Sequence, residues 1–264
     1  MRNSRLLWTL AIVITLASAV WQRLSGPTYP LRGRAELAGE SVKYRLIRTH
    51  GGPGDQPVRV VVPDPAVHGQ VAWRRFPTSD EWQHIAMRRE GEALLAALPH
   101  QPPAGKLEYQ VRLTKAGATV AFPERAAVTR FKGEVASWIL APHILAMFLG
   151  MLFSTRAGLA ALVGIDARRD AWWAFALLVV GGLVLGPAVQ KQAFGEWWTG
   201  VPYGWDLTDN KTLVAAIAWA VAVVAMRGRR PARGAIVTAA VLTLVVFAIP
   251  HSVWGSEIKW DAPR

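Results

Sequence analysis

The sequence predicts an α+β membrane protein with five transmembrane helices and an antiparallel β-sandwich inserted between the first and second helices. Apolar residues are concentrated in five blocks, with the charged residues between them. The long segment after the first block instead alternates polar and apolar residues, the period of a half-buried strand. These patterns predict three parts: an N-terminal anchor (1–26), a β domain (27–132) and a four-helix membrane domain (133–264).

The five apolar blocks cover residues 6–21, 135–153, 171–189, 212–226 and 235–254. About 20 residues are needed to cross the hydrocarbon core, and each block reaches this length with the aromatic residues at its ends. Ala17-Ser18-Ala19 in the first block also fits a signal-peptidase site, so a cleaved signal peptide is the alternative to a retained anchor. We expect the anchor. Pro187 is expected to kink or end the third helix.

Basic residues alternate between the two sides of the blocks, which predicts the orientation, because Lys and Arg collect on the cytoplasmic side. The N-terminus is predicted inside, with the C-terminus and the β domain outside. This topology is typical of a multi-pass protein of a bacterial inner (cytoplasmic) membrane, with its β domain in the periplasm or outside. Tryptophans near the block ends, Trp254 among them, agree with it. The residues on the inner side are Arg2, Arg5, Arg156, Arg168, Arg169, Arg227, Arg229, Arg230 and Arg233.

The segment 27–132 contains about seven candidate strands separated by turn sequences. Strict alternation marks residues 41–48, 57–63 and 107–113, and weaker patterns mark 70–76, 82–87, 93–98 and 126–131. Short strands at this spacing, separated by Gly- and Pro-rich turns, are typical of an antiparallel sandwich.

The stretch from Pro102 to Val111, closed by Lys115-Ala116-Gly117, resembles the penultimate strand of a fibronectin-type-III or immunoglobulin-like module. In that family a tyrosine near the start of the strand caps the corner, and Tyr109 matches it. The resemblance covers this segment alone, and it implies a fold rather than an activity.

The composition limits the possible functions. Without cysteine, the chain has neither a disulfide framework nor a thiolate metal site. The net charge is +12. The basic residues that produce it are mixed with acids in the β domain or lie beside apolar blocks, so we expect the lipid bilayer as partner and no nucleic acid. His50-Gly51-Gly52-Pro53-Gly54 resembles a hydrolase oxyanion loop, but the chain has no Gly-x-Ser-x-Gly elbow. We interpret this string as a loop between strands.

Two histidines are candidate cofactor ligands. His143 follows Pro142 inside the second block, and His251 follows Pro250 at the outer end of the fifth. Ionisable residues in a membrane are costly and usually face the interior of the bundle. Two such imidazoles are able to ligate a haem iron, to bind a quinone headgroup, or to hydrogen-bond to neighbouring helices. We expect the last.

The outer segment 190–211 is dense in aromatic residues, glycine and acids. We expect Thr208 or Asp209 to cap the following helix. Cation binding by the carboxylates, with Glu196 and with Glu257 or Asp261 of the tail, is a weaker alternative. The residues predicted to bind a partner are Trp197, Trp198, Tyr203, Trp205, Asp206 and Asp209.

These features predict a non-catalytic accessory or scaffold subunit of a larger membrane assembly, with other membrane-protein subunits as partners. The alternative is a small membrane redox protein that holds a haem or quinone near His143 and His251. A transporter or enzyme with a cation in the outer loop is less favoured, because no Asp, Glu, Lys or Arg is predicted near the middle of a span.

Overall fold

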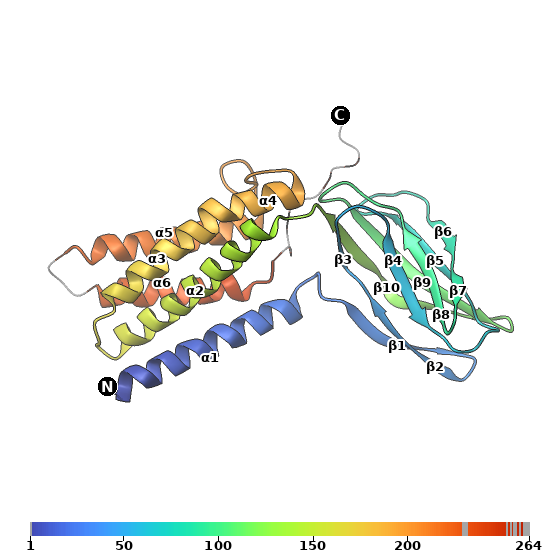
Figure 1. Cartoon of the computed structure of the whole chain (residues 1–264), viewed down its shortest axis with the longest axis horizontal. Coiled ribbons are helices and arrows are strands. Elements are labelled where there is room, and N and C mark those ends of the chain that lie inside the picture. Colours follow the sequence, from blue (N-terminus) through green and yellow to red (C-terminus); the bar gives the residue numbers. More distant parts are fainter. Residues whose placement is uncertain are drawn as a thin grey trace. The chain divides into compact units, whose positions relative to one another are not determined.

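The protein is described by a computed structural model in which residues 2–228, 232–251, 253, 255, 258 and 260 are placed. It is an α+β protein that divides into two compact units (Figure 1). The helical unit comprises Met1–Pro27 and Val135–Ser256. The β unit comprises Thr28–Glu134 together with Glu257–Arg264. Five residues with a predicted place lie outside the described residues: Arg229, Arg230, Trp254, Glu257 and Asp261.

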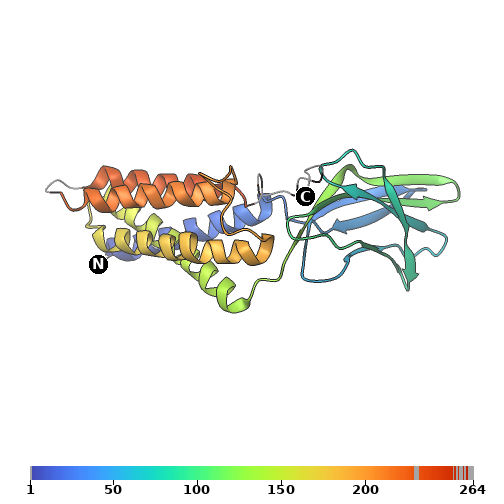
Figure 2. The ribbon, with the colours of Figure 1, turned by 90° about the horizontal axis from the view of Figure 1, so that it is seen from above.

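Among the described residues of the helical unit, four helical segments are long and apolar enough to cross a membrane. Their helices run alongside one another in both views (Figures 1 and 2). The third is one continuous helix built from α3, the π-helical η1 and α4, so the expectation that Pro187 ends it is wrong. Pro187 lies in the first turn of α4, directly after η1. The elements are α1 (Arg2–Ser25), α2 (Ser137–Leu162), α3 (Arg168–Leu178), η1 (Val179–Leu185), α4 (Gly186–Phe194), α5 (Leu207–Ala225) and α6 (Arg233–Ala248).

The fifth predicted span is shorter than expected. Helix α6 has 16 residues, about 24 Å at 1.5 Å per residue, against a hydrocarbon core of about 30 Å. Carbonyl groups at such an end need donors, because lipid supplies none. Three side chains from α1 and α5 supply them: Gln22 donates to Phe247 O (2.8 Å), Trp21 to Ala248 O (3.1 Å) and Lys211 to Ile249 O (2.7 Å).

Helix α2 extends beyond its predicted end and includes Arg156, which the sequence pattern placed in an inner loop. The side chain is buried. Its Nη1 lies 3.6 Å from a carboxylate oxygen of Asp170, and its guanidinium lies 5.4 Å from the ring centroid of Trp8. An ion pair and an aromatic face compensate the buried charge. Arg156 therefore joins α1, α2 and α3.

Close contacts also fix α5 against its neighbours. Trp219 is fully buried and donates to Thr243 Oγ1 of α6 at 2.9 Å. Two turns earlier along α5, a Cβ placed on Gly182 of η1 would collide with the Thr212 side chain. Glycine is required at position 182 because it lets the two backbones approach closely.

In its described residues the β unit has ten strands in three sheets: β1-β2, β3-β10-β9-β5-β6 and β4-β8-β7. The pairing is not antiparallel throughout, as the sequence predicted, because β3 pairs parallel with β10. All seven candidate segments contain a strand. The sequence pattern missed β1, β3 and β7, and it found only the end of β10. The strands are β1 (Leu31–Leu37), β2 (Glu40–Leu46), β3 (Thr49–Gly51), β4 (Gln56–Val61), β5 (His68–Arg75), β6 (Gln83–Ala86), β7 (Arg88–Glu90), β8 (Ala93–Leu98), β9 (Lys106–Lys115) and β10 (Ala118–Lys132).

Side chains from all three sheets share one apolar core. Tyr109 of β9 is among its largest buried members, and its hydroxyl donates to the Ile47 carbonyl at 2.7 Å. Beside it, the rings of Tyr44 and Phe122 stack with centroids 4.6 Å apart. The Tyr109 hydroxyl thus bonds to a segment 62 residues earlier, and it ties β9 to the chain that follows β2.

Candidate functional site

The loop between α4 and α5 is fixed by one buried carboxylate. Asp209 Oδ2 accepts hydrogen bonds from the backbone N–H groups of Thr199 (2.6 Å) and Gly200 (3.1 Å). It also accepts from the Thr199 hydroxyl (3.2 Å) and from Gln190 (3.1 Å). Next to it, Asn210 Oδ1 accepts from Val201 N at 2.8 Å. Two consecutive residues of α5 therefore hold the backbone of the loop in one conformation.

The loop is shorter than predicted, because both flanking helices extend into 190–211. Residues 190–194 belong to α4 and 207–211 to α5, so the loop covers 195–206. The N-cap of α5 is Asp206, whose Oδ1 accepts from Thr208 N at 2.8 Å. The expectation that Thr208 or Asp209 caps this helix is wrong. Asp209 is one turn further along and faces the loop instead.

The six residues predicted to bind a partner divide into two groups. Trp197, Tyr203 and Trp205 are 59%, 82% and 86% exposed. Trp198 is half-buried and donates to Val201 O at 3.1 Å. The two acids serve the loop itself, Asp206 as N-cap and Asp209 as its central acceptor. Both acids thus form hydrogen bonds within the loop or at the start of α5, and three large aromatic side chains remain exposed.

His143 is held by the irregular helix opposite it. Its Nδ1 lies 2.8 Å from the carbonyl oxygen of Gly181 in η1. A carbonyl only accepts, so Nδ1 carries the proton, and Nε2 of the neutral ring has a free electron pair. Metal-bound histidines are commonly oriented by such a bond, and π-helical turns are frequent at functional sites. The imidazole is half-buried.

His251 follows the end of α6 and is exposed. Two residues before it, the Ile249 carbonyl accepts a hydrogen bond from Lys211 of α5 at 2.7 Å. No group of three or more His, Asp or Glu side chains that could hold a metal ion occurs in the described part of the chain.

Sequence reasoning missed Lys211. It was assigned to the outer loop, but it lies in the second turn of α5 and is 2% exposed. Its ammonium donates to Ile249 O at 2.7 Å and lies 5.8 Å from the ring centroid of Phe247. The signal for it was Asp206: a helix starting after this cap includes Lys211. The burial depends on α6, which the local sequence does not reveal.

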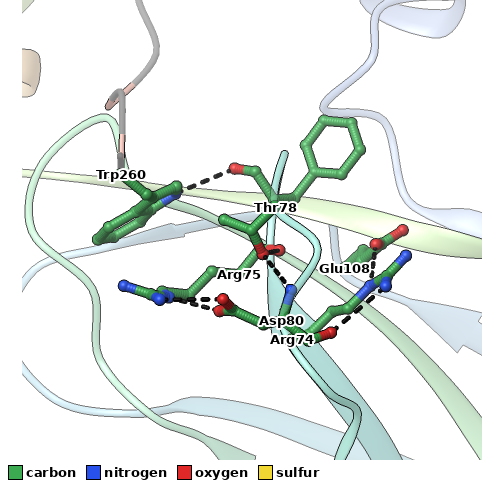
Figure 3. A network of polar contacts seen from close by, with 7 residues as sticks. Arg74, Arg75, Thr78, Asp80, Glu108 and Trp260 are labelled. Atoms are coloured by element: carbon green, nitrogen blue, oxygen red, sulfur yellow. Dashed lines mark hydrogen bonds and ion pairs between the residues drawn. The ribbon is translucent and has the colours of Figure 1, made fainter. Parts of the chain in front are cut away.

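A second polar site lies in the β unit (Figure 3). Arg75 forms a bidentate pair with Asp80 at 2.6 and 3.0 Å, and Arg74 bonds to Glu108 at 2.5 Å. Trp260 of the C-terminal segment donates to the Phe76 carbonyl at 3.3 Å. A cleft of about 460 Å³ adjoins this network. It is lined by Trp73, Arg74, Arg75, Asp80, Glu81, Trp82, Gln83 and Gln101.

The Arg75–Asp80 pair makes the stability of the β unit depend on acid. Hydrogen bonding to Arg75 lowers the pKa of Asp80 below its ordinary value. A lowered folded-state pKa stabilises the fold above the unfolded pKa of about 3.9, and this contribution is lost as pH falls through the folded pKa. We expect Asp80→Asn to have a smaller loss of melting temperature below about pH 4 than the parent. An equal fall of melting temperature with pH in the two proteins would contradict this expectation.

No protein-family model matches the chain, and a comparison with curated proteins found no match.

Proposed function

We propose that the protein is a non-catalytic accessory or scaffold subunit of a larger assembly in a bacterial inner membrane. Its partner surfaces are the β unit, which we propose to be a fibronectin- or immunoglobulin-like sandwich, and the loop 195–206. One observation supports this most: a loop fixed by buried hydrogen bonds keeps three aromatic side chains uncovered. Its partners are other membrane-protein subunits.

The loop has the properties of a prepared binding surface. Asp209 and Asn210 fix its backbone, so little conformational entropy remains to be lost when a partner binds. Trp197, Tyr203 and Trp205 offer large ring areas, and Trp and Tyr are enriched among residues that dominate binding energy.

The accessory role is tested by purification from native membranes in mild detergent. We expect the parent protein to co-purify with other subunits, and Trp205→Glu to release them, because a carboxylate opposes burial of this position. Trp138→Glu is the matched control, since Trp138 is also highly exposed (75%) but belongs to α2. A parent protein recovered alone, even after crosslinking, would count against the proposal.

We also propose the orientation that the basic residues indicate, with the N-terminus in the cytoplasm and the β unit outside. Arg168, Arg169 and Arg233 support it, since they begin helices at the same predicted face. A reporter that is active only in the cytoplasm should be active when fused after Gly228 and silent when fused within the β unit. The reverse pattern would contradict the orientation.

A redox function is the second candidate, because the hydrogen bond between Nδ1 and Gly181 O leaves Nε2 of His143 free. The two imidazoles would hold a haem or bind a quinone. We expect instead that His143→Ala lowers the stability of the helical unit by about 1 kcal/mol through the lost hydrogen bond to Gly181. The purified protein should then have no Soret band. A Soret band that His143→Ala abolishes would establish the redox candidate.

A further inference from the structure

The cleft in the β unit has the size of a small-molecule site. Its volume of about 460 Å³ falls within the range of about 300–1,000 Å³ that is typical of such sites. Residues 73–75 at the end of β5 and residues 80–83 leading into β6 form most of its lining. Gln101, from the segment between β8 and β9, completes it. All these residues belong to the β unit.

The charged groups around the cleft largely compensate one another. Arg75 forms its bidentate pair with Asp80, and Arg74 bonds to Glu108. Charge-assisted bonds of this kind are among the stronger hydrogen bonds. An anionic ligand would have to displace carboxylates that are already in place, and a cationic ligand would meet two arginines. The remaining ionisable side chain of the lining, Glu81, is exposed to solvent. The lining therefore favours a ligand without net charge.

Other polar groups of the lining have no hydrogen-bond partner among the described residues. They are the carboxylate of Glu81, the side-chain amide of Gln83 and the indole N–H of Trp82. Gln101 donates through Nε2 to two neighbouring backbone carbonyls, which leaves its Oε1 as an acceptor. The set thus contains both donors and acceptors. A hydroxyl group is itself a donor and an acceptor, so a ligand rich in hydroxyl groups matches this lining.

Two tryptophans give the cleft its apolar surface. The guanidinium of Arg74 lies 4.6 Å from the ring centroid of Trp82, and Glu108 holds this arginine in turn, so one face of the indole is fixed. Nε1 of Trp73 is buried, and this residue therefore offers ring carbons to the cleft rather than a donor. A pyranose ring has C–H groups on its faces and hydroxyl groups at its rim, and flat indole rings match such a face.

We propose that this cleft binds a neutral oligosaccharide. One pyranose ring stacks on the face of Trp82 that Arg74 leaves uncovered. Its hydroxyl groups bond to Glu81, Gln83 and Gln101. The paired arginines orient these groups and do not bind the sugar through their charge. Sugar binding at this cleft depends neither on the accessory role nor on the loop 195–206.

The test uses the full-length protein in lauryldimethylamine oxide, a detergent without a sugar headgroup. Cellobiose and N,N′-diacetylchitobiose are titrated as neutral disaccharides and digalacturonate as an anionic one, with saturation-transfer NMR of the sugar protons as the readout. The variants are Trp82→Ala and Gln83→Ala; Gln83 is exposed, so its replacement is expected to leave the fold intact. Trp138→Ala is the matched control, because Trp138 is an exposed tryptophan of α2.

We expect the parent to bind at least one of the neutral disaccharides saturably, and digalacturonate at least about tenfold more weakly. Trp82→Ala should weaken sugar binding at least about tenfold and Gln83→Ala about threefold, whereas Trp138→Ala should bind like the parent. A preference for diacetylchitobiose would identify acetamido sugars as the ligands, and a preference for cellobiose would identify sugars with hydroxyl groups alone.

Three results would overturn the sugar site: a parent that binds neither neutral disaccharide, tightest binding of digalacturonate, or cleft variants that bind like the parent. Equal weakening by Trp138→Ala would also overturn it, because the sugar would then bind elsewhere. If Trp82→Ala does not fold, Gln83→Ala and the comparison of neutral with anionic sugar still decide.

Discussion

Replacing Tyr109 by alanine is expected to lower the free energy of unfolding of the β unit by about 4 kcal/mol. The ring is 1% exposed and packs among side chains of all three sheets, so its removal leaves a large cavity. The substitution also removes the hydrogen bond to Ile47 O. Thermal and denaturant unfolding of the full-length protein, followed by β-type circular dichroism, measures the loss.

Tyr109→Phe separates the two contributions. It keeps the ring and removes only the hydroxyl, so we expect a loss of about 1 kcal/mol. A Tyr109→Ala protein that unfolds like the parent would show that the ring is not in the core. It would also remove the main support for the fibronectin- or immunoglobulin-like sandwich, since Tyr109 carries that resemblance.

Replacing Asp209 by alanine is expected to release the loop 195–206 and to lower stability by about 3 kcal/mol, since a buried donor left without its acceptor costs about 1–3 kcal/mol. The substitution leaves the backbone N–H groups of Thr199 and Gly200 without their carboxylate acceptor. Hydrogen exchange of these two amides should become much faster, and proteases should cut the loop.

Asn210→Ala is the control for this substitution. It removes a single acceptor from the same loop, that of Val201 N, so we expect about 1 kcal/mol and faster exchange at that amide alone. Unchanged exchange at Thr199 and Gly200 in Asp209→Ala would mean that the loop is held by other contacts. The exposed aromatic residues would then not be fixed by α5.

The sequence was sufficient for features that depend on local pattern. The apolar blocks became helices, and the alternating segments became strands. The ends of elements were harder to predict, because they depend on side chains distant in sequence. Helix α6 ends at Ala248 where Trp21, Gln22 and Lys211 supply donors. The short strand β3 exists through its pairing with β10.

The candidate site was predictable only in part, because some of its features depend on residues distant in sequence. Exposed aromatic residues in the loop followed from its composition. The separate roles of Asp206 as N-cap and Asp209 as acceptor for the loop could not be predicted, because they depend on the folded conformation of the loop. Lys211 and Arg156 were assigned to loops by their charge, and both are buried in helices. Their burial arises from packing of helices that are far apart in the chain.

Site-specific photo-crosslinking in native membranes shows whether the loop 195–206 contacts another protein. A photoreactive amino acid replaces Tyr203, which belongs to this loop and is 82% exposed. A second protein carries it at Trp138 as the control. We predict a discrete adduct with another membrane protein from position 203 and none from position 138. Adducts with lipid alone from position 203 would contradict the accessory role.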